Sequence, residues 1–249
     1  MKNKSNLFAG TTLQDPYISV VVPVYQNRET LYALFNRLHQ VLQSKGFSYE
    51  IIFVNDASPD DLLVILEKLA RENSQVGVLD LERNIGQNQA VLVGLRYARG
   101  TCVVIMDADL QDPPEAIPDL VDKLQEGTAA VFAGRRGQYE SPFRLFTSRL
   151  FKKLLQLLCG VPEDAGIFVA MNRHTVKCLL GFNTTRPSIV AMIGCTQLPL
   201  VSIPVVRAQR PSGISAYSFW RRFKAGLLTI AWVIAWKWFP GFRTSKRCE

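Results

Sequence analysis

The sequence predicts an α/β protein in which a mostly parallel sheet is covered by helices on both faces. Short apolar runs rich in Val and Ile recur along the N-terminal half of the chain, and longer amphipathic stretches separate them. The runs are apolar throughout, whereas a half-exposed strand would alternate apolar and polar residues. Strands of that composition, alternating with helices, are typical of a buried parallel sheet.

The order of the elements follows from the positions of these runs and of the residues that end them. The predicted strands comprise residues 18–25, 49–56, 76–81, 101–107 and 129–134. The predicted helices comprise residues 28–45, 58–74, 87–99 and 114–126. Gly46 follows the first helix, where a left-handed backbone is common. Ser58 is the predicted N-cap of the second helix, with Pro59 at its first position.

The composition indicates a globular protein with an uneven charge. The 249 residues suffice for one large core, and a hydrophobic content of 48% excludes a wholly disordered chain. The formal net charge is +8, and Arg and Lys dominate from Arg135 onwards. A basic half is typical of proteins that face nucleic acid, anionic lipid or phosphorylated ligands, and equally of a solvated basic surface.

The cysteines and the N-terminus indicate the compartment. The five cysteines are odd in number and form no Cys-X-X-Cys pair, which favours a reducing compartment over a zinc site or a disulfide framework. Residues 1–16 lack the apolar core of a signal peptide and form a polar tail. The sequence therefore predicts a cytoplasmic chain.

Polar residues follow four of the predicted strands. They are Tyr25-Gln26-Asn27, Asn55-Asp56, Glu82-Arg83-Asn84 and Asp107-Ala108-Asp109. Any one group could simply cap the helix that follows it. Ligands of parallel sheets bind beyond the carboxyl ends of the strands, and the four groups meet at that edge. We therefore expect a binding site there.

The stretch DADLQDPPE, residues 107–115, concentrates negative charge at the same edge. Asp107, Asp109 and Asp112 would repel one another unless something positive lies beside them. An Asp-X-Asp pattern after a buried strand is a hard oxygen site suited to Mg²⁺ or Mn²⁺ together with substrate phosphates. Gln111 could add a neutral oxygen.

Several other ligand chemistries are disfavoured. The sequence contains no G-X-X-X-X-G-K-[S/T] loop and no G-X-G-X-X-G after the first strand. The Asp-X-Asp pattern lies on a late strand and continues to Gln111, which disfavours a phosphatase that forms an aspartyl phosphate. His39 and His174 lie outside the strand-end groups, so a histidine-driven mechanism is not expected.

Five motifs in order resemble those of the family 2 glycosyltransferases of the GT-A fold. They are VVPVYQN, VNDASPD, ERNIGQNQA, MDADLQDPPE and RPSGISAYSFWRR, and the likeness extends over residues 17–223. Within that family they look most like the polyprenyl-phosphate branch, which includes dolichol-phosphate mannose synthases and bacterial enzymes that load glucose or aminoarabinose onto undecaprenyl phosphate. The resemblance implies a GT-A catalytic domain over residues 17–217, followed by a basic and aromatic membrane-interface segment over residues 218–249.

The resemblance and the strand-end groups together imply the site residues. Expected contacts to a UDP- or GDP-sugar are Pro23, Tyr25, Asn27, Asp56, Asn84, Asp107, Arg210 and Ser215. Expected ligands of Mg²⁺ or Mn²⁺ are Asp107, Asp109 and Gln111. Expected contacts to the acceptor phosphate are Arg135, Arg136 and Arg149. The expected catalytic residues are Asp107, Asp109, Asp164 and Arg149.

The chain also departs from the family pattern. Gln26-Asn27 replaces the usual Asn-Glu, and Ala216 stands where a lysine is common, so single contacts to the donor are in doubt. The membrane-spanning helices of most bacterial relatives are missing, as is the QxxRW motif of processive synthases. The resemblance implies no nucleic-acid partner. A separate membrane subunit or a homo-oligomer remains open.

Two segments favour a lipid acceptor. In residues 141–160 one helical face is apolar (Phe143, Phe146, Leu150, Phe151, Leu154, Leu157 and Leu158) and the other is basic (Arg144, Arg149, Lys152 and Lys153). Residues 225–236 are apolar but span only about 18 Å as a helix, which is too short to cross a bilayer. Trp232, Trp236 and Trp238 suit the membrane interface, and Arg221, Arg222, Arg243, Lys246 and Arg247 suit anionic headgroups. Packing on the core is an equally good reading of the first segment.

These expectations lead to one main hypothesis and two alternatives. The main hypothesis is an inverting, metal-dependent glycosyltransferase with a polyprenyl phosphate acceptor, peripheral on the cytoplasmic side of the cell membrane. In the first alternative the acceptor is a glycan hydroxyl and Asp164 is the base. In the second the chain is a non-catalytic nucleotide-sugar-binding subunit of a membrane partner.

Overall fold

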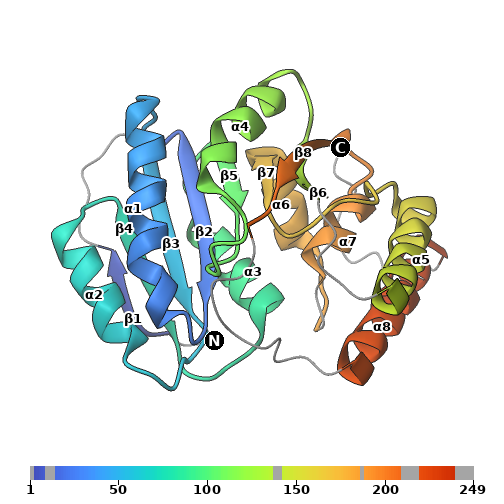
Figure 1. The fold of residues 1–249 in the computed structure, drawn as a ribbon, viewed down its shortest axis with the longest axis horizontal. Helices are drawn as coiled ribbons and strands as arrows, with labels where there is room; N and C mark the ends of the chain where they lie inside the picture. Colours follow the sequence, from blue (N-terminus) through green and yellow to red (C-terminus); the bar gives the residue numbers. More distant parts are fainter. Residues whose placement is uncertain (1–2, 9–14, 137–141, 186–187, 209–218, 239–249) are drawn as a thin grey trace.

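The computed structural model describes residues 3–8, 15–136, 142–185, 188–208 and 219–238. In these residues eight strands form one sheet in the order β1-β4-β3-β2-β5-β7-β6-β8 (Figure 1). The strands are β1 (Asn3–Phe8), β2 (Ile18–Val24), β3 (Tyr49–Asn55), β4 (Val76–Leu81), β5 (Cys102–Ile105), β6 (Ala130–Arg136), β7 (Val169–Asn172) and β8 (Leu200–Val206).

Helices cover both faces of the sheet. The helices are α1 (Arg28–Ser44), α2 (Leu62–Glu72), α3 (Gln87–Tyr97), the short 3₁₀ helix η1 (Pro114–Ala116), α4 (Ile117–Gln125), α5 (Pro142–Cys159), α6 (Arg173–Gly181), α7 (Ile189–Cys195) and α8 (Phe219–Trp238). The core on one face includes side chains of α1, α2 and α4, and the core on the other face those of α3 and α5 to α8. This arrangement confirms the predicted fold class.

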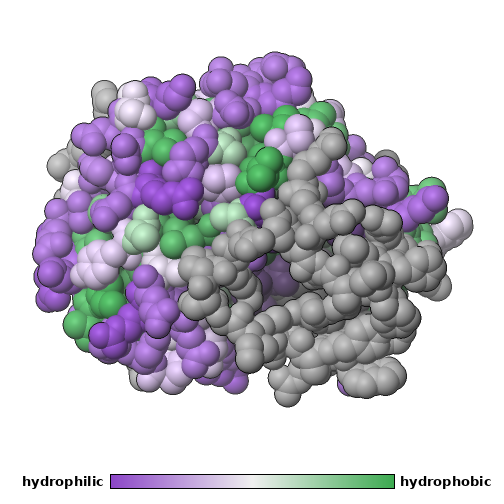
Figure 2. Space-filling model, in the orientation of Figure 1, coloured by the Kyte–Doolittle hydropathy of each residue, from purple (hydrophilic) through white to green (hydrophobic). Residues whose placement is uncertain are grey.

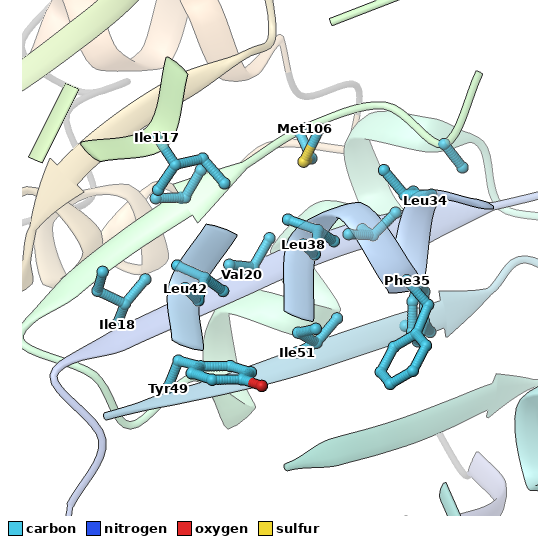
Figure 3. Packing of buried hydrophobic residues seen from close by; sticks show 14 of the residues in the cluster. Ile18, Val20, Leu34, Phe35, Leu38, Leu42, Tyr49, Ile51, Met106 and Ile117 are labelled. Atoms are coloured by element: carbon cyan, nitrogen blue, oxygen red, sulfur yellow. The ribbon is translucent and has the colours of Figure 1, made fainter. Parts of the chain in front are cut away.

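The packing of α1 shows how the apolar pattern produces these layers. Leu34, Leu38 and Leu42 recur every fourth residue, so they lie along one side of the helix and are fully buried against Val20 and Ile51 of the sheet (Figure 3). Neighbouring strand residues point to the opposite core, which is why the strands are apolar on both faces. Outside, hydrophilic residues predominate over α1 and α2 (Figure 2).

All five predicted strands are present, with ends that differ by at most two residues. β5 ends at Ile105 rather than at residue 107, and β6 continues to Arg136. β1, β7 and β8 were not predicted, and β1 lies in the expected polar tail, where it pairs antiparallel with β4. β7 runs antiparallel between β5 and β6, so the sheet is parallel except at β1 and β7.

The start of α2 differs from the prediction. The helix begins at Leu62 after Asp61, and Ser58 is not its N-cap. The backbone of Ala57 has a φ of +52°, and the Ser58 amide donates to Asn55 Oδ1, so the chain turns before it can become helical. The Ser58 hydroxyl donates to Asp60 instead. Gly46, by contrast, follows α1 with a φ of +68°, as expected.

The cysteines agree only in part with the expectation that they are reduced. Cys102, Cys159 and Cys195 are buried free thiols, and burial raises the pKa of Cys102 to about 12. Cys178, in contrast, is disulfide-bonded. Sequence spacing does not report which sulfur atoms lie close together in the fold, so this bond was not foreseen.

Candidate active site

The loops that follow β2, β3 and β5 lie side by side because these strands are neighbours and run parallel. Each loop holds one residue with a left-handed backbone: Gln26 at φ +56°, Ala57 at +52° and Leu110 at +59°. Residues other than glycine adopt this conformation only where the surroundings enforce it, at a cost of about 1–3 kcal/mol each. The Gln26 amide donates to Ser58 Oγ at 2.8 Å, which joins the first two loops. The strained backbone is thus concentrated at the predicted edge.

The aspartate loop, defined here as residues 107–112, follows β5 at the same edge. The side chains of Asp107 and Asp109 are half-buried. The Gln87 side-chain amide donates to Asp107 Oδ1, and the Thr30 hydroxyl donates to the Ala108 carbonyl at 2.6 Å. The starts of α3 and α1 therefore hold the loop from two sides.

Asp109 is oriented from within the loop. The Gln111 amide donates to Asp109 Oδ1 at 3.1 Å, across the left-handed residue Leu110. The two carboxylates project from one short segment and supply hard oxygen atoms, which fits a divalent cation completed by phosphate oxygens. Among the described residues no cluster of three or more His, Cys, Asp or Glu side chains could hold a metal without such help.

Asp112 has a different role from its two neighbours. It is 2% exposed, and Arg207 binds both of its oxygen atoms, with Nε 2.5 Å from Oδ1 and Nη2 3.0 Å from Oδ2. The positively charged partner of Asp112 is therefore Arg207, which lies just after β8. This partner was not predicted, because it lies far along the chain and follows a strand that was not predicted either.

Asp56, the expected contact to the base, is buried at the end of β3. Its two carboxylate oxygens accept hydrogen bonds from the backbone amides of Ile85 at 2.7 Å and Gly86 at 2.9 Å. Burial raises the pKa of Asp56, and these two amides partly offset that rise. The carboxylate thus fixes the loop between β4 and α3. Its contact to a nucleotide base stays a prediction.

The other expected donor contacts lie around these loops. Pro23 pairs with Val54 within the sheet, and Tyr25 follows β2 with 42% of its surface exposed. Asn27 precedes α1, but its side chain accepts from the Tyr25 amide at 2.9 Å rather than capping the helix. Asn84 is exposed in the loop after β4. All four lie at or near the carboxyl ends of β2 and β4, and their binding roles stay predictions.

Asp164 lies near the same edge of the sheet, in the segment that leads into β7. It precedes β7, whose first residue, Val169, pairs antiparallel with Ile105 at the end of β5 and with Phe132 in β6. A Cβ at Gly134 would lie 2.1 Å from Asp164 Oδ2 and 2.3 Å from Ser202 Oγ. Only a glycine on β6 therefore leaves room for this carboxylate. Within the described residues Ser202 Oγ is buried without a hydrogen-bond partner.

Several expected residues lie wholly outside the described part of the chain, or only their backbone is described. Arg210 and Ser215 lie outside the described residues, as do Arg243, Lys246 and Arg247. Arg135 and Arg136 end β6 and Arg149 lies in α5, but only their backbone is described. The Gln87 and Thr30 contacts were not foreseen, although Gln87 belongs to the ERNIGQNQA motif.

The helices α5 and α8 pack against each other, and each exposes large apolar side chains. We refer to these side chains together as the α5–α8 face: Leu154, Leu157, Leu227, Leu228, Ile234 and Trp238. Leu157 is 71% exposed and Trp238 is 70% exposed. No helix in the described part of the chain is both long enough and apolar enough to span a membrane.

Two of the three tryptophans assigned to the membrane interface are half-buried and pack on the core. Trp232 and Trp236 pack on Phe182, with ring centroids 5.7 and 5.6 Å apart, and both contact the core. Only Trp238 belongs to the α5–α8 face. The helical repeat places residues 232 and 236 on the side that meets α6 and α7, which composition alone could not indicate.

Comparison with known proteins identifies relatives by sequence. Residues 19–181 match the family described as "Glycosyl transferase family 2". The chain is 35% identical over 207 residues to the undecaprenyl-phosphate 4-deoxy-4-formamido-L-arabinose transferase of Klebsiella pneumoniae (strain 342), which covers 82% of this chain and 63% of that protein. The chain therefore spans about 63% of the length of the curated relatives that it matches.

Solved structures share the fold at lower identity. The mannosyltransferase PcManGT from Pyrobaculum calidifontis, in complex with GDP-Man and Mn²⁺, has a TM-score of 0.62 at 21% identity and covers 94% of this chain and 66% of that one. S. aureus TarS 1-349 in complex with UDP-GlcNAc has a TM-score of 0.62 at 22% identity, covering 88% and 66%. Glucosyl-3-phosphoglycerate synthase from Mycobacterium tuberculosis, with Mn²⁺, UDP and phosphoglyceric acid, has a TM-score of 0.61 at 18% identity, covering 88% and 78%.

Proposed function

Because the chain belongs to glycosyl transferase family 2, we propose that it is a metal-dependent, inverting glycosyltransferase that moves a sugar from a nucleotide-diphosphate sugar to a polyprenyl phosphate. Its fold is the GT-A fold. The observation that supports the proposal best is the aspartate loop at the carboxyl edge of the sheet. Gln87 of α3 holds Asp107, the Gln111 backbone amide holds Asp109, and Thr30 of α1 holds the Ala108 carbonyl.

Asp107 and Asp109 are the residues that would hold Mg²⁺ or Mn²⁺, with Gln111 beside them. A bound divalent cation supplies positive charge that stabilises the departing diphosphate as its negative charge develops. Gln87 and the Gln111 amide orient the two carboxylates before any donor arrives, which lowers the cost of ordering the site. Solved structures of the same fold are complexes with GDP-Man and UDP-GlcNAc, which supports a UDP- or GDP-sugar as donor.

We expect the acceptor end of the site to bind a phosphate. A phosphate monoester has a second pKa of about 6, so it is mostly ionised at neutral pH and needs alignment rather than a strong base. Arg135 and Arg136 follow Gly134 at the end of β6, and Arg149 lies on α5. Arginine binds phosphate through paired hydrogen bonds. The Klebsiella pneumoniae relative named for undecaprenyl phosphate supports this acceptor class.

A glycan hydroxyl is the second candidate acceptor. An alcohol needs a general base, and the carboxylate of Asp164 lies beside Gly134 at the end of β6. If Asp164 is that base, its replacement by Asn abolishes turnover. If the acceptor is a phosphate, the same variant keeps substantial activity.

The α5–α8 face supports a peripheral position at a membrane, which we place on the cytoplasmic side. Neither helix contains Asp or Glu, and Lys153 and Lys224 are exposed next to the apolar side chains. An apolar surface with basic neighbours is complementary to the headgroups and upper acyl chains of an anionic bilayer. That position would bring the site to a lipid-linked phosphate.

The proposed reaction is tested by product analysis. The protein is incubated with undecaprenyl phosphate, Mn²⁺ and a panel of UDP- and GDP-sugars, and the lipids are identified by mass spectrometry. We expect one sugar to appear as an undecaprenyl phosphate sugar. Transfer to a glycan but never to the lipid phosphate would favour the second candidate, and donor binding without any transfer would refute the proposed activity.

Replacement of Arg149 by Ala should raise the acceptor concentration needed for half-maximal rate, or lower the rate, by roughly 10- to 150-fold. A hydrogen bond to a charged group contributes about 1.5–3 kcal/mol, which corresponds to that range. Arg149→Lys should recover little if the contact is bidentate. Initial rates against undecaprenyl phosphate in detergent measure the effect, with UDP affinity measured in parallel.

The control for Arg149 is Arg71→Ala, which removes an exposed arginine at the end of α2. It should change neither acceptor nor donor kinetics. Equal losses of donor and acceptor affinity in the Arg149 variant would mean that this residue supports the fold rather than the acceptor.

Polar residues on the α5–α8 face should weaken membrane binding. Burying a large apolar side chain contributes about 1.5–3 kcal/mol, so Leu157→Ser with Trp238→Ser should lower the partition coefficient on phosphatidylglycerol vesicles by at least roughly tenfold. Cosedimentation with vesicles measures this, and high salt should weaken wild-type binding because it screens the basic residues. Val64→Ser, on the exposed side of α2, is the matched control and should bind as wild type does.

A further inference from the structure

The buried ion pair between Asp112 and Arg207 joins the aspartate loop to the end of β8. The two contacts, 2.5 Å from Nε to Oδ1 and 3.0 Å from Nη2 to Oδ2, form a bidentate fork. The Asp112 side chain is 2% exposed and that of Arg207 is 14% exposed. Water and salt screen such a pair only weakly, so it restrains both the distance and the angle between the two segments.

A backbone connection lies directly beside this pair. The Ala208 amide donates to the Gln111 carbonyl at 2.9 Å, and the Gln111 amide donates to Asp109 Oδ1 at 3.1 Å. Arg207 and Ala208 thus bind two consecutive loop residues, Asp112 and Gln111. The backbone amide of Gln111 in turn orients the carboxylate of Asp109. Between Asp109 and Gln111 lies Leu110, whose φ of +59° is unfavourable unless its neighbours are fixed.

We propose that Asp112 and Arg207 are positioning residues for Asp109. The pair holds the aspartate loop in the conformation in which the Asp109 carboxylate faces a divalent cation and the diphosphate of the donor. This inference rests on the proposed function, because it needs a metal-dependent nucleotide site at the loop. Neither residue of the pair is assigned a direct contact with substrate or metal.

The same pair also stabilises the fold, so a single substitution cannot separate the two effects. Removing one partner leaves the other as an uncompensated buried charge, which is strongly destabilising. Replacing both partners by apolar residues of similar size removes the charges together and often preserves stability. A double variant can therefore lose the restraint on the loop while the protein remains folded.

The test compares Asp112→Leu/Arg207→Met with wild type. We expect the double variant to melt close to the wild-type temperature, whereas Arg207→Met alone melts much lower. Calorimetry in Mn²⁺ should show UDP affinity reduced at least about tenfold in the double variant. Without Mn²⁺ the UDP affinity of the double variant should equal that of wild type.

A nearby exposed ion pair provides the control. Arg37 binds Glu115 just beyond the loop, with 36% and 51% of the two side chains exposed. Arg37→Met/Glu115→Leu should leave Mn²⁺-dependent UDP binding unchanged. If this control loses affinity as the double variant does, the effect is not specific to the Asp112–Arg207 pair and the inference is wrong.

Two further outcomes separate the inference from the proposed function. If wild type binds UDP or GDP in a Mn²⁺-dependent way and the folded double variant binds equally well, Asp112 and Arg207 have only a structural role and the inference alone is refuted. If wild type binds neither nucleotide in a Mn²⁺-dependent way, the proposed function fails and the inference fails with it.

Discussion

Alanine at position 109 should abolish Mn²⁺-dependent UDP binding and lower turnover by about a thousandfold or more. Asp109 and Asp107 are the two acidic side chains that the aspartate loop presents, and the backbone of Gln111 orients Asp109. Removing one of two anionic ligands leaves too few to hold a divalent cation, and stabilisation of the leaving group, worth several kcal/mol, is lost with it. Calorimetry with UDP, with and without Mn²⁺, and initial rates measure the two effects.

Asp119→Ala is the matched control for Asp109, because Asp119 is an exposed aspartate on the nearby helix α4. It should bind UDP and turn over as wild type does. Metal-dependent affinity that persists unchanged in Asp109→Ala would remove Asp109 from the site and would make Asp107 the residue to test next.

Alanine in place of Glu50 should destabilise the protein by about 3–5 kcal/mol. Glu50 is 4% exposed at the start of β3 and accepts hydrogen bonds from the Ser19 hydroxyl at 2.6 Å and from the Arg99 amide at 2.8 Å. The Arg99 guanidinium donates to its second oxygen at 2.9 and 2.8 Å, and the Gly100 amide donates to Ser19 Oγ at 2.7 Å. Loss of the carboxylate removes the acceptor of the Ser19 hydroxyl, the Arg99 amide and the Arg99 guanidinium.

For a chain of this size the loss corresponds to a melting temperature lower by roughly 6–20 °C. Thermal unfolding measures it, and Glu72→Gln, which changes an exposed ion pair with Lys68, should shift the transition little. UDP affinity of the folded Glu50 variant should be unchanged, since Glu50 lies at the edge opposite the aspartate loop. A melting temperature equal to wild type would show that water replaces the carboxylate at no cost.

The sequence predicted those parts of the fold that local pattern determines. Apolar runs such as Ile18–Val24 and Tyr49–Asn55 are long and flanked by turn residues, so their position was clear. β7 comprises only Val169–Asn172, and β8 contains Pro204 and is only half-buried, so neither produced a strong signal. The antiparallel direction of β7 is a matter of its pairing with β5 and β6, which no local pattern contains.

The same limit applies to the site. Asp107 and Asp109 were found because only one residue separates them and they follow an apolar run. The partner of Asp112 lies 95 residues away, so no spacing rule could reveal it. The inward position of Trp232 was missed for a related reason: a helix in which nearly every residue is apolar does not indicate which side meets the core.

Because β7 runs antiparallel to β5 and β6, the segment at the site comes before β7, whereas the loops at the site come after β2, β3 and β5. This difference decides which segments can change without disturbing the sheet. The loops after β2, β3 and β5 continue directly from strands that end at the site. A change in one of these loops therefore also shifts residues that fix the register of its strand. The segment between α5 and β7 instead arrives at the site before its strand begins, with Asp164 near its middle. If Asp164 faces the proposed acceptor, insertions or exchanges there would alter the acceptor contacts while β2, β3 and β5 keep their pairing. We therefore expect acceptor preference to change more readily than donor preference when this scaffold is redesigned.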